Sequence, residues 1–348
     1  MKMLRLCILL GISLFFFFEI QGQEHYRVVS YNVENFFDTK PDTLTQDRDF
    51  TPGGRLHWNT ERYTAKLLKI AGVIEAVGEG DFPAFVGLCE VENRKVLSDL
   101  VSKTQLAEAD YGIVHQDSPD PRGIDVALLY RKKYFRVLKE VFLPVALSGE
   151  KKSYSRDVLQ VTGILQGQDS LFRDTLHFFV CHFPSMSGGE AESEWKREKA
   201  ALVVKNRVDT LLKYSPNTAL LILGDLNGKA NRPAQAFVLR TLSSDSRQIE
   251  NSRLYNTGYY LLHRNKGSYK YKGQWQTIDH ILVSGNLLNG QCRLQAGRRL
   301  QVFAPLFLLE EDKTYYGYKP FRTYSGPRYV GGYSDHLPLY LDLFFRKF

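Results

Sequence analysis

Short apolar runs, several of them following one another directly, constrain the fold of this chain more than any other feature of its sequence. We expect buried strands at residues 27–32, 84–89, 124–130, 158–165, 176–183, 219–223, 278–283 and 337–343. Apolar residues at helical spacing predict helices over residues 63–77, 96–101 and 190–214. Because many strands are not separated by a helix, this order favours a mixed sheet, or two packed sheets flanked by helices, over a purely parallel doubly wound sheet.

One domain is expected over residues 23–348, because no repeat, low-complexity tract or Pro/Ser-rich linker interrupts the chain. Residues 39–60 are polar and contain Pro and Gly, which predicts a long loop. The composition, with 43% hydrophobic and 24% charged residues, is that of a globular protein. It excludes disordered, collagen-like and coiled-coil chains.

The first 22 residues have the features of a secretory signal peptide. Lys2 and Arg5 precede an apolar stretch at residues 6–18, which is too short to span a membrane. Ile20 stands where a small residue is usual before a cleavage site, so an uncleaved anchor is the alternative. We expect the protein to be exported to the periplasm or the outside of the cell.

Three cysteines, Cys89, Cys181 and Cys292, remain after this segment. An odd number at wide spacing indicates neither a disulfide framework nor a zinc motif. At most one pair could form, and the sequence does not say which. We expect all three to be small buried hydrophobic residues.

Polar side chains follow or interrupt the apolar runs in five places. These are YNVEN at residues 31–35, CEVEN at 89–93, CHFPS at 181–185, GDLN at 224–227, and TIDH at 277–280 taken with SDHLP at 334–338. A carboxylate at the end of a buried strand is unfavourable unless it is paired or binds a cation. Five such segments indicate strand ends that converge on one polar cleft.

The residue types in these segments are those of a metal-assisted phosphoryl hydrolase. Carboxylate oxygens suit Mg²⁺, and histidines transfer protons near neutral pH. The chain has no Walker loop, GxSxG motif, dinucleotide-binding motif or zinc-spaced Cys/His cluster.

The ordered series YNVEN, CEVEN, RGIDVALLY, CHFPS, GDLN, TIDHILVS and SDHLP resembles the endonuclease/exonuclease/phosphatase superfamily, which includes pancreatic deoxyribonuclease and the abasic-site endonucleases. The resemblance covers nearly the whole mature chain. It implies an α/β fold, a four-layer sandwich of two mixed β-sheets packed face to face with helices on the outside, and metal-dependent phosphoester hydrolysis. The segments FTPGGRLHW and KGSYKYKGQW look like those of the exported bacterial branch.

The resemblance also implies a metal site. Glu90 matches the main metal carboxylate, and Asn32 matches its neighbour, which orients the metal and the nucleophile. Glu34 matches an often acidic position that can join the metal shell through water, with a solvated strand-end charge as the alternative. Asp335 matches a position that contacts the metal directly or through water. The expected ion is Mg²⁺, with Mn²⁺ and Ca²⁺ as alternatives.

Catalytic roles follow from the same resemblance. Asp225 and Asn227 match the pair that holds the attacking water and a phosphate oxygen. His336 matches the histidine beside the scissile phosphate, and Asp279 matches the carboxylate that orients it, as an Asp holds a catalytic His in one tautomer. Whether His336 takes a proton from water or stays charged is left open.

A second histidine completes the expected site. His182 matches the second histidine of the deoxyribonuclease-like members, and Asp125 is the expected partner that orients it. Arg156 matches a phosphate-contacting arginine, with an ordinary surface charge as the alternative. His280 is expected to be packed in the core or behind the catalytic groups.

Three functions are compatible with these observations. The first is an exported endonuclease that cleaves DNA, or RNA, supported by His182, Arg156 and a formal charge that falls only from +8 to +7 without residues 1–22. Tyr269, Tyr271 and Trp275, interleaved with lysines, could stack on bases, or could form the packed face of a hairpin. The second is a phosphatase or phosphodiesterase acting on a small molecule or lipid headgroup, and the third is a non-enzymatic binding module. We expect a monomer with no stable protein partner.

Overall fold

Two seven-stranded sheets form the centre of the computed structural model, which describes residues 25–147, 154–167 and 173–346. In hydrogen-bonded order the first sheet contains β14 (Leu294–Ala296), β20 (Leu339–Phe345), β1 (His25–Phe36), β2 (Phe85–Val91), β4 (Asp125–Arg131) and β3 (Tyr111–His115), and β15 (Gln301–Val302) also pairs with β20. The second contains β5 (Phe135–Ala146), β6 (Tyr154–Gln166), β7 (Arg173–His182), β8 (Ala219–Asp225), β13 (Asp279–Ser284), β10 (Leu254–Asn256) and β9 (Leu242–Ser243). The expected signal peptide lies outside the described residues.

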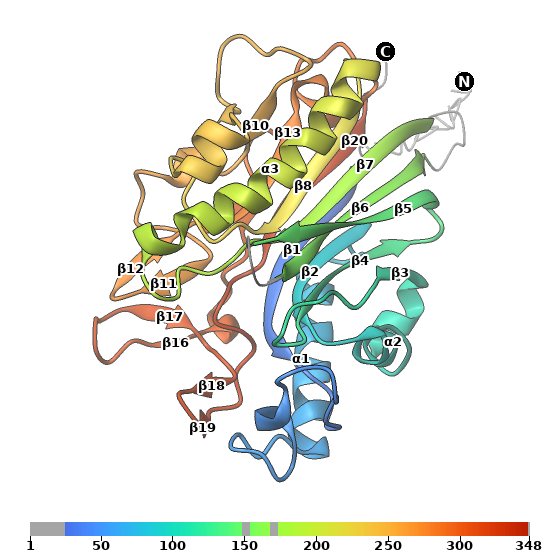
Figure 1. Ribbon diagram of the computed structural model, residues 1–348. Helices are drawn as coiled ribbons and strands as arrows, with labels where there is room; N and C mark the ends of the chain where they lie inside the picture. The colour runs from blue at the N-terminus through green and yellow to red at the C-terminus, as the bar shows by residue number, and fades with distance from the viewer. Residues whose placement is uncertain (1–24, 148–153, 168–172, 347–348) are drawn as a thin grey trace, which may run out of the picture.

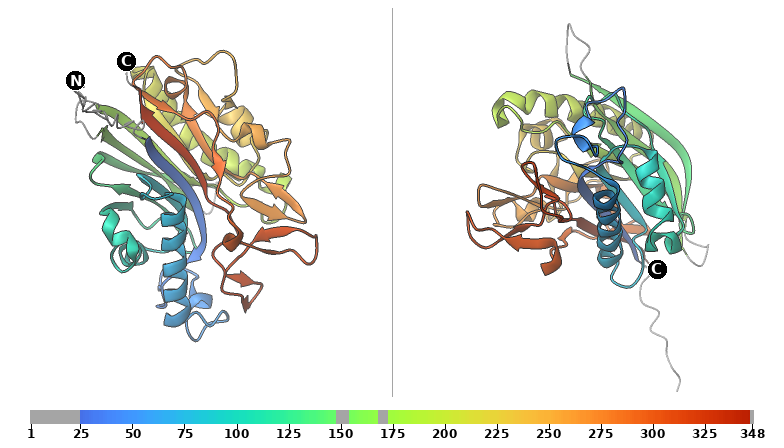
Figure 2. Two further views of the ribbon diagram at one scale, coloured as in Figure 1. Left: turned by 180° about the vertical axis from the view of Figure 1, so that it is seen from behind. Right: turned by 90° about the horizontal axis from the view of Figure 1, so that it is seen from below.

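Three α-helices cover the outer faces of the sheets (Figure 1). They are α1 (Thr60–Val77), α2 (Arg94–Ser102) and α3 (Glu190–Tyr214). The side chains of Asn59 and Asn93 cap α1 and α2 by accepting hydrogen bonds from the first-turn N–H groups. Seen from behind, α1 and α2 pack on the first sheet (Figure 2), whereas α3 crosses the second. Within the described residues, no helix has the length and apolar character to cross a membrane.

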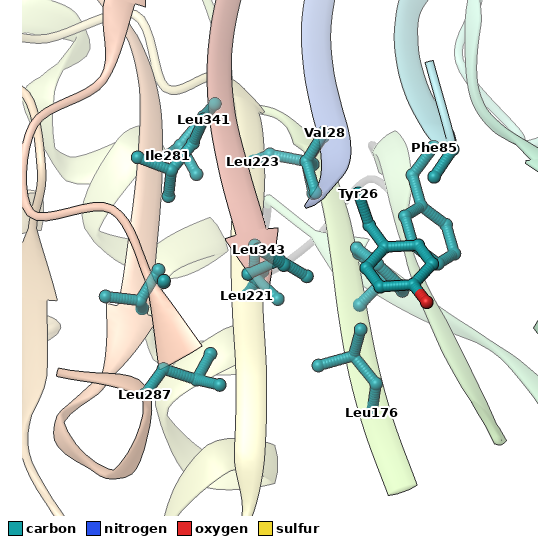
Figure 3. Close-up of a cluster of buried hydrophobic side chains, with 14 of the residues drawn as sticks. Tyr26, Val28, Phe85, Leu176, Leu221, Leu223, Ile281, Leu287, Leu341 and Leu343 are labelled. Carbon is teal, nitrogen blue, oxygen red and sulfur yellow. The ribbon is translucent and has the colours of Figure 1, made fainter. Parts of the chain in front are cut away.

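Three separate apolar cores hold these layers together. The central core lies between the sheets, where Val28 and Phe85 of the first sheet meet Leu221, Leu223 and Ile281 of the second (Figure 3). A second core joins the other face of the first sheet to α1 and α2, and a third joins the second sheet to α3. Helix, sheet, sheet and helix therefore form four layers, which confirms the predicted α/β sandwich.

Shorter elements extend the sandwich at one end. The small hairpins are β11 (Tyr269–Tyr271) with β12 (Gln274–Gln276), β16 (Leu309–Glu311) with β17 (Tyr318–Pro320), and β18 (Tyr324–Ser325) with β19 (Arg328–Tyr329). The short helical turns are η1 (Arg48–Phe50), η2 (Gln105–Ala109), η3 (Ala234–Val238), η4 (Tyr259–Leu261), η5 (Gly285–Leu287) and η6 (Leu306–Leu308). The predicted loop at residues 39–60 is irregular apart from η1 and Thr60, the first residue of α1.

The register of the sheets brings the polar strand ends together at one end of the molecule. β1 and β20 are antiparallel and pair His25 with Phe344, so the two described chain ends lie at the opposite end. Farther along β1, Asn32 pairs with β2 beside Glu90. In the second sheet, Asp225 of β8 pairs with His182 of β7 on one side and with Asp279 of β13 on the other.

The three described cysteines are free thiols. Cys89 and Cys181 are fully buried, as expected, but Cys292 is only partly buried. The first two therefore act as small core residues of the facing sheets.

Candidate active site

Side chains from both ends of the chain surround one carboxylate oxygen, Oδ2 of Asp225. It accepts a hydrogen bond from Nδ2 of Asn32 at 3.2 Å and lies 3.7 Å from Nε2 of His182 and 3.8 Å from Nε2 of His336. All four side chains are at most 6% exposed. Burial and the neighbouring Asp279 carboxylate raise the pKa of Asp225 to about 7. The predicted convergence of these strand ends is therefore present.

The two histidines beside Asp225 have opposite electrostatic surroundings. Nδ1 of His336 lies 2.7 Å from Oδ2 of Asp279, whose carboxylate also accepts a hydrogen bond from the Ser268 hydroxyl. Burial alone would lower the pKa of His336, but Asp279 outweighs it and holds that pKa well above the usual value. Asp279 is thus positioned to orient His336 and to stabilise its charged form.

His182 is the neutral member of the pair. Burial, together with the positive charges of Arg156 and Arg122, holds the pKa of His182 well below the usual value. Its Nε2 lies 3.8 Å from Oε1 of Glu90. Among the described residues, Nδ1 of His182 has no hydrogen-bond partner.

The prediction that Asp125 orients His182 is wrong. The Asp125 carboxylate accepts a hydrogen bond from the Ser118 backbone N–H at 3.0 Å and lies 3.8 Å from Nε2 of His115. Side chains alternate along β4, and Asp125 shares a face with Ala127, which packs toward the helices rather than toward the second sheet. The side chain of Asp125 therefore points away from His182.

Glu90 provides the carboxylate that best fits a divalent cation. It is the last but one residue of β2 and has a φ of +66°, and one of its oxygens accepts a hydrogen bond from the Asn35 N–H at 2.9 Å. Its other oxygen lies 3.4 Å from Nδ2 of Asn32. Glu34, at +52°, and Asn227, at +48°, are also left-handed, a conformation that is unfavourable for these residues and is often found at functional sites. These hard oxygen donors fit Mg²⁺ or a similar ion.

A second group of potential ligands lies close by. Atoms of Asp225, Asp279 and His336 are within 4.8 Å of one another. A cation among them would have to replace the hydrogen bond between His336 and Asp279, so we assign the metal role to the Glu90 side of the site. The family and this donor set support a divalent metal.

Glu34 and Asp335 border the site beyond Glu90. Glu34 is 8% exposed and accepts a hydrogen bond from the Thr323 N–H at 2.6 Å. Burial and the charge of Asp335 raise the pKa of Glu34 to about 7. Asp335 forms an ion pair with Arg322 at 2.7 Å. Both predicted metal-shell residues thus lie at the site. Glu34 is bonded to Thr323 and Asp335 to Arg322, two neighbouring residues of the chain.

Lys66 is a residue of this site that the sequence analysis missed. It is 1% exposed and donates hydrogen bonds to Thr323 Oγ1 and to the Tyr333 carbonyl, at 2.5 and 2.8 Å. Burial lowers the pKa of Lys66 to about 8, and Glu34 opposes that shift. The available signal was its position between Tyr63 and Ile70, on the buried face of the predicted helix.

Arg156 is not an ordinary surface charge. It is 6% exposed, forms an ion pair with Asp120 at 3.0 Å and donates to the Phe183 carbonyl at 2.9 Å. That carbonyl also accepts a hydrogen bond from Asn227 Nδ2 at 3.0 Å, which places Arg156 next to Asn227. Its contact with phosphate stays a prediction. A second arginine, Arg122, was not predicted; its side chain is half exposed, and it acts electrostatically on Glu90, Asp225 and His182.

His280 matches its expected structural role. Nδ1 of His280 lies 3.0 Å from Asn256 Nδ2, and its Nε2 lies 2.8 Å from the Gly228 carbonyl, so the ring is packed behind the catalytic groups. Tyr269 of β11 forms an isolated bridge with His336, and the centroids of their rings are 4.9 Å apart. The aromatic hairpin therefore borders the site.

The two-sheet sandwich, with acidic, amide and imidazole groups gathered at its strand ends, is the arrangement of one class of phosphoester hydrolases. The chain belongs to the endonuclease/exonuclease/phosphatase family, whose model matches residues 27–345. Members of this family are phosphoester hydrolases that depend on a divalent metal.

Solved structures support the same fold. An endonuclease/exonuclease/phosphatase family protein from Bacteroides thetaiotaomicron is 16% identical, with 93% of this chain and 96% of that chain covered and a TM-score of 0.54. The human Nocturnin catalytic domain with bound sulfate is 15% identical, with 93% and 98% covered and a TM-score of 0.52. A Bacteroides thetaiotaomicron mannosyl-6-phosphatase is 15% identical, with 92% and 100% covered and a TM-score of 0.54. A comparison with curated proteins gives no match.

Proposed function

We propose that this protein is an exported, Mg²⁺-dependent phosphodiester hydrolase that cleaves nucleic acid, DNA in the first place. The observation that carries the proposal is the pair of histidines on either side of Asp225, one neutral and one held in its charged form. Diester cleavage needs one proton to leave the attacking water and another, or a metal, to reach the leaving oxygen. Two imidazoles with opposed pKa shifts at one site can perform both tasks.

In this proposal Glu90 holds the metal, Asn32 orients the Glu90 carboxylate through its Nδ2, and Glu34 and Asp335 complete the surroundings of the ion. The ion would stabilise the negative charge that develops on the phosphate oxygens. Asn227 donates one amide hydrogen to a backbone carbonyl, and the second hydrogen of the same amide can be donated to a phosphate oxygen.

Proton transfer is assigned to the residues around Asp225. Its carboxylate lies within 4 Å of both imidazoles and can orient the attacking water between them. Asp279 keeps the charged His336 in place at 2.7 Å. His182, neutral and buried, is available to exchange a proton at Nε2, the nitrogen that faces Glu90 and Asp225.

Nucleic acid is favoured as substrate by the hairpin beside His336. Tyr271, at the tip of this hairpin, is 52% exposed and could stack on a base. Lys270 is not free to contact phosphate, because it forms an ion pair with Asp312 at 2.8 Å. The binding surface of the hairpin would therefore be aromatic more than electrostatic.

A small phosphoester is the second candidate substrate. It is favoured by a cavity of about 310 Å³ that opens beside Asp335 and Glu34, a volume suited to one ring rather than to a duplex. The mannosyl-6-phosphatase with the same fold carries such a substrate in its name, which concerns that protein only.

The proposal is tested with purified residues 23–348, with Mg²⁺ or with EDTA. The substrates are plasmid DNA, RNA, a sphingomyelin analogue and a bis-aryl phosphodiester. Nicking of the plasmid only with Mg²⁺ is the expected result. Turnover of small esters alone would replace the nuclease by the second candidate, and lack of turnover on all four would contradict hydrolysis.

Site variants separate catalysis from folding. Glu90→Gln and His336→Ala should lose activity by about 10²-fold or more while remaining folded, as checked by circular dichroism. Glu61→Gln and His57→Ala, which change the same residue types outside the site, serve as matched controls. Full activity of either site variant would contradict its assigned role. Fractionation of cells that express the full chain tests export, and size-exclusion chromatography tests the expected monomer.

A further inference from the structure

A half-enclosed pocket lies next to the metal side of the site, and the chemistry described above assigns no role to its arginines. Its volume is about 310 Å³. The walls come from the loop before α1 and from the segment around β18. Its charged and aromatic lining side chains are Glu34, Phe50, Arg55, Arg322, Tyr324 and Asp335.

The pocket is continuous with the catalytic groups. Glu34 and Asp335 line it and also border the proposed metal position. Oδ1 of Asp335 lies 3.9 Å from Nε2 of His336. A phosphate held beside His336 would therefore direct one of its ester substituents into this pocket.

One wall of the pocket is rigid and aromatic. Phe50 stacks on Phe37 with ring centroids 4.2 Å apart and an interplanar angle of 14°. On the other side, the Tyr324 hydroxyl donates to the Leu56 carbonyl at 3.0 Å. Because these contacts fix both rings, the pocket has a preformed width that suits a flat or chair-shaped ring.

The second wall carries guanidinium groups with unused donors. Arg55 is 61% exposed and donates to Asp49 through Nε and Nη2, which leaves Nη1 with no partner among the described residues. Arg322 is 34% exposed and donates to Asp335 through Nη2. A guanidinium has five N–H donors, so both arginines can bind a further anion without breaking their ion pairs.

The unused N–H donors in the pocket favour an anionic ligand. The lining carries two cations, Arg55 and Arg322, and two carboxylates, Glu34 and Asp335. A divalent cation beside Glu34 and Asp335 would make the balance more positive. An apolar occupant would leave the remaining guanidinium N–H donors without an acceptor, which is unfavourable.

We propose that this pocket is a subsite for the substituent next to the scissile phosphate, and that this substituent is a compact ring carrying a second anionic group. The inference deepens the proposed hydrolase function and rests on it. The same chemistry has two sources: the adjacent phosphate of a nucleotide chain, or the second phosphate of a small bisphosphate ester. Arg55 is the residue that recognises the second charge.

The test uses two pairs of substrates whose members differ only in added phosphate, one group in the small-molecule pair and two in the nucleotide pair. The nucleotide pair is the thymidine dinucleotide TpT and the same dinucleotide with phosphates on both ends, and the small-molecule pair is glucose 1-phosphate and glucose 1,6-bisphosphate. For at least one pair, kcat/KM of the wild type should be about tenfold or more higher for the member with the extra phosphate, because a charge-assisted hydrogen bond distinguishes them. The pair that shows this preference identifies the source.

Arg55→Gln assigns the preference to the pocket. It should reduce the ratio of kcat/KM within the pair to near one, mainly by raising KM for the more charged member. Arg48→Gln, in the same loop but outside the pocket lining, should keep the ratio of the wild type. Arg55 is largely exposed, so the variant is expected to fold; its melting temperature checks this.

Failure of the subsite and failure of the hydrolase proposal give different results. Equal kcat/KM within both pairs, with turnover of the bis-aryl phosphodiester, would overturn the subsite and leave the hydrolase. If no ester is hydrolysed, the hydrolase proposal fails and the same pairs are compared by calorimetric titration with Mg²⁺. Equal dissociation constants there would overturn the subsite, and a preference that Arg55→Gln abolishes would support it.

Discussion

Replacement of Lys66 by methionine removes one buried cation beneath the proposed metal position. Methionine keeps most of the aliphatic stem, so the change leaves packing on α1 nearly intact and deletes the ammonium group. The Thr323 hydroxyl and the Tyr333 carbonyl, which accept from Nζ at 2.5 and 2.8 Å, would lose their donor in a site that is 1% exposed. Glu34 would lose its nearest compensating buried charge.

The magnitude follows from these contacts. Each buried acceptor left without a donor destabilises the folded state by about 1–3 kcal/mol. Burial already disfavours the Lys66 ammonium and lowers its pKa to about 8, so loss of this cation also removes a destabilising contribution. The pKa of Glu34 is about 7, so part of its charge is already neutralised near neutral pH. We therefore expect Lys66→Met to lower the free energy of unfolding by about 2 kcal/mol, mainly through the acceptors left without a donor.

The assay is urea unfolding at pH 7 in EDTA, followed by circular dichroism, for Lys66→Met, Glu34→Gln and the double variant. The double variant should be about 1–2 kcal/mol more stable than the sum of the single changes predicts, because the neutral Gln no longer needs the cation. Lys69→Met, on the same helix but less buried, should cost about 1 kcal/mol or less. A loss below about 1 kcal/mol for Lys66→Met, or strict additivity, would refute this electrostatic account.

Three further changes test other parts of the structure. Asp279→Asn should lower kcat by about 10²-fold or more and move the pH–rate profile to lower pH, because the pKa of His336 falls without the carboxylate charge; an unmoved profile would contradict the pairing. His115→Gln should reduce the loss of stability on acidification, measured by urea unfolding at pH 7 and pH 5, because burial lowers the pKa of His115 to about 4. The free energy of unfolding of the wild type then falls by up to about 3 kcal/mol as the pH falls from about 6.5 toward 4, because the unfolded state binds a proton that the buried His115 does not. Above that range His115 does not affect stability. Gly224→Ala should destabilise by about 2 kcal/mol more than Gly80→Ala in thermal unfolding, since both glycines have positive φ but only at Gly224 does a Cβ meet a backbone oxygen, at 1.9 Å; equal effects would exclude that clash.

Most of the fold could be predicted because its signals are local. The apolar runs and the 3.6-residue periodicity place the main strands and helices within a few residues of their observed bounds. β5 was missed because it is an edge strand on which most side chains are at least partly exposed, so no buried run marks it. The small hairpins β16–β17 and β18–β19 were also missed, because strands of two or three residues are too short to show an alternating pattern.

The amino-acid sequence by itself determined which chemical groups stand at the strand ends, and hence the family and the gathering of Asn32, Asp225 and His336. Only the tertiary structure decided which groups are partners. Asp125 turns to His115 because side chains alternate across a sheet, and Glu34 meets Thr323 because a segment 289 residues away folds over β1. Such contacts depend on the register and packing of distant segments, and no local pattern of residues records them.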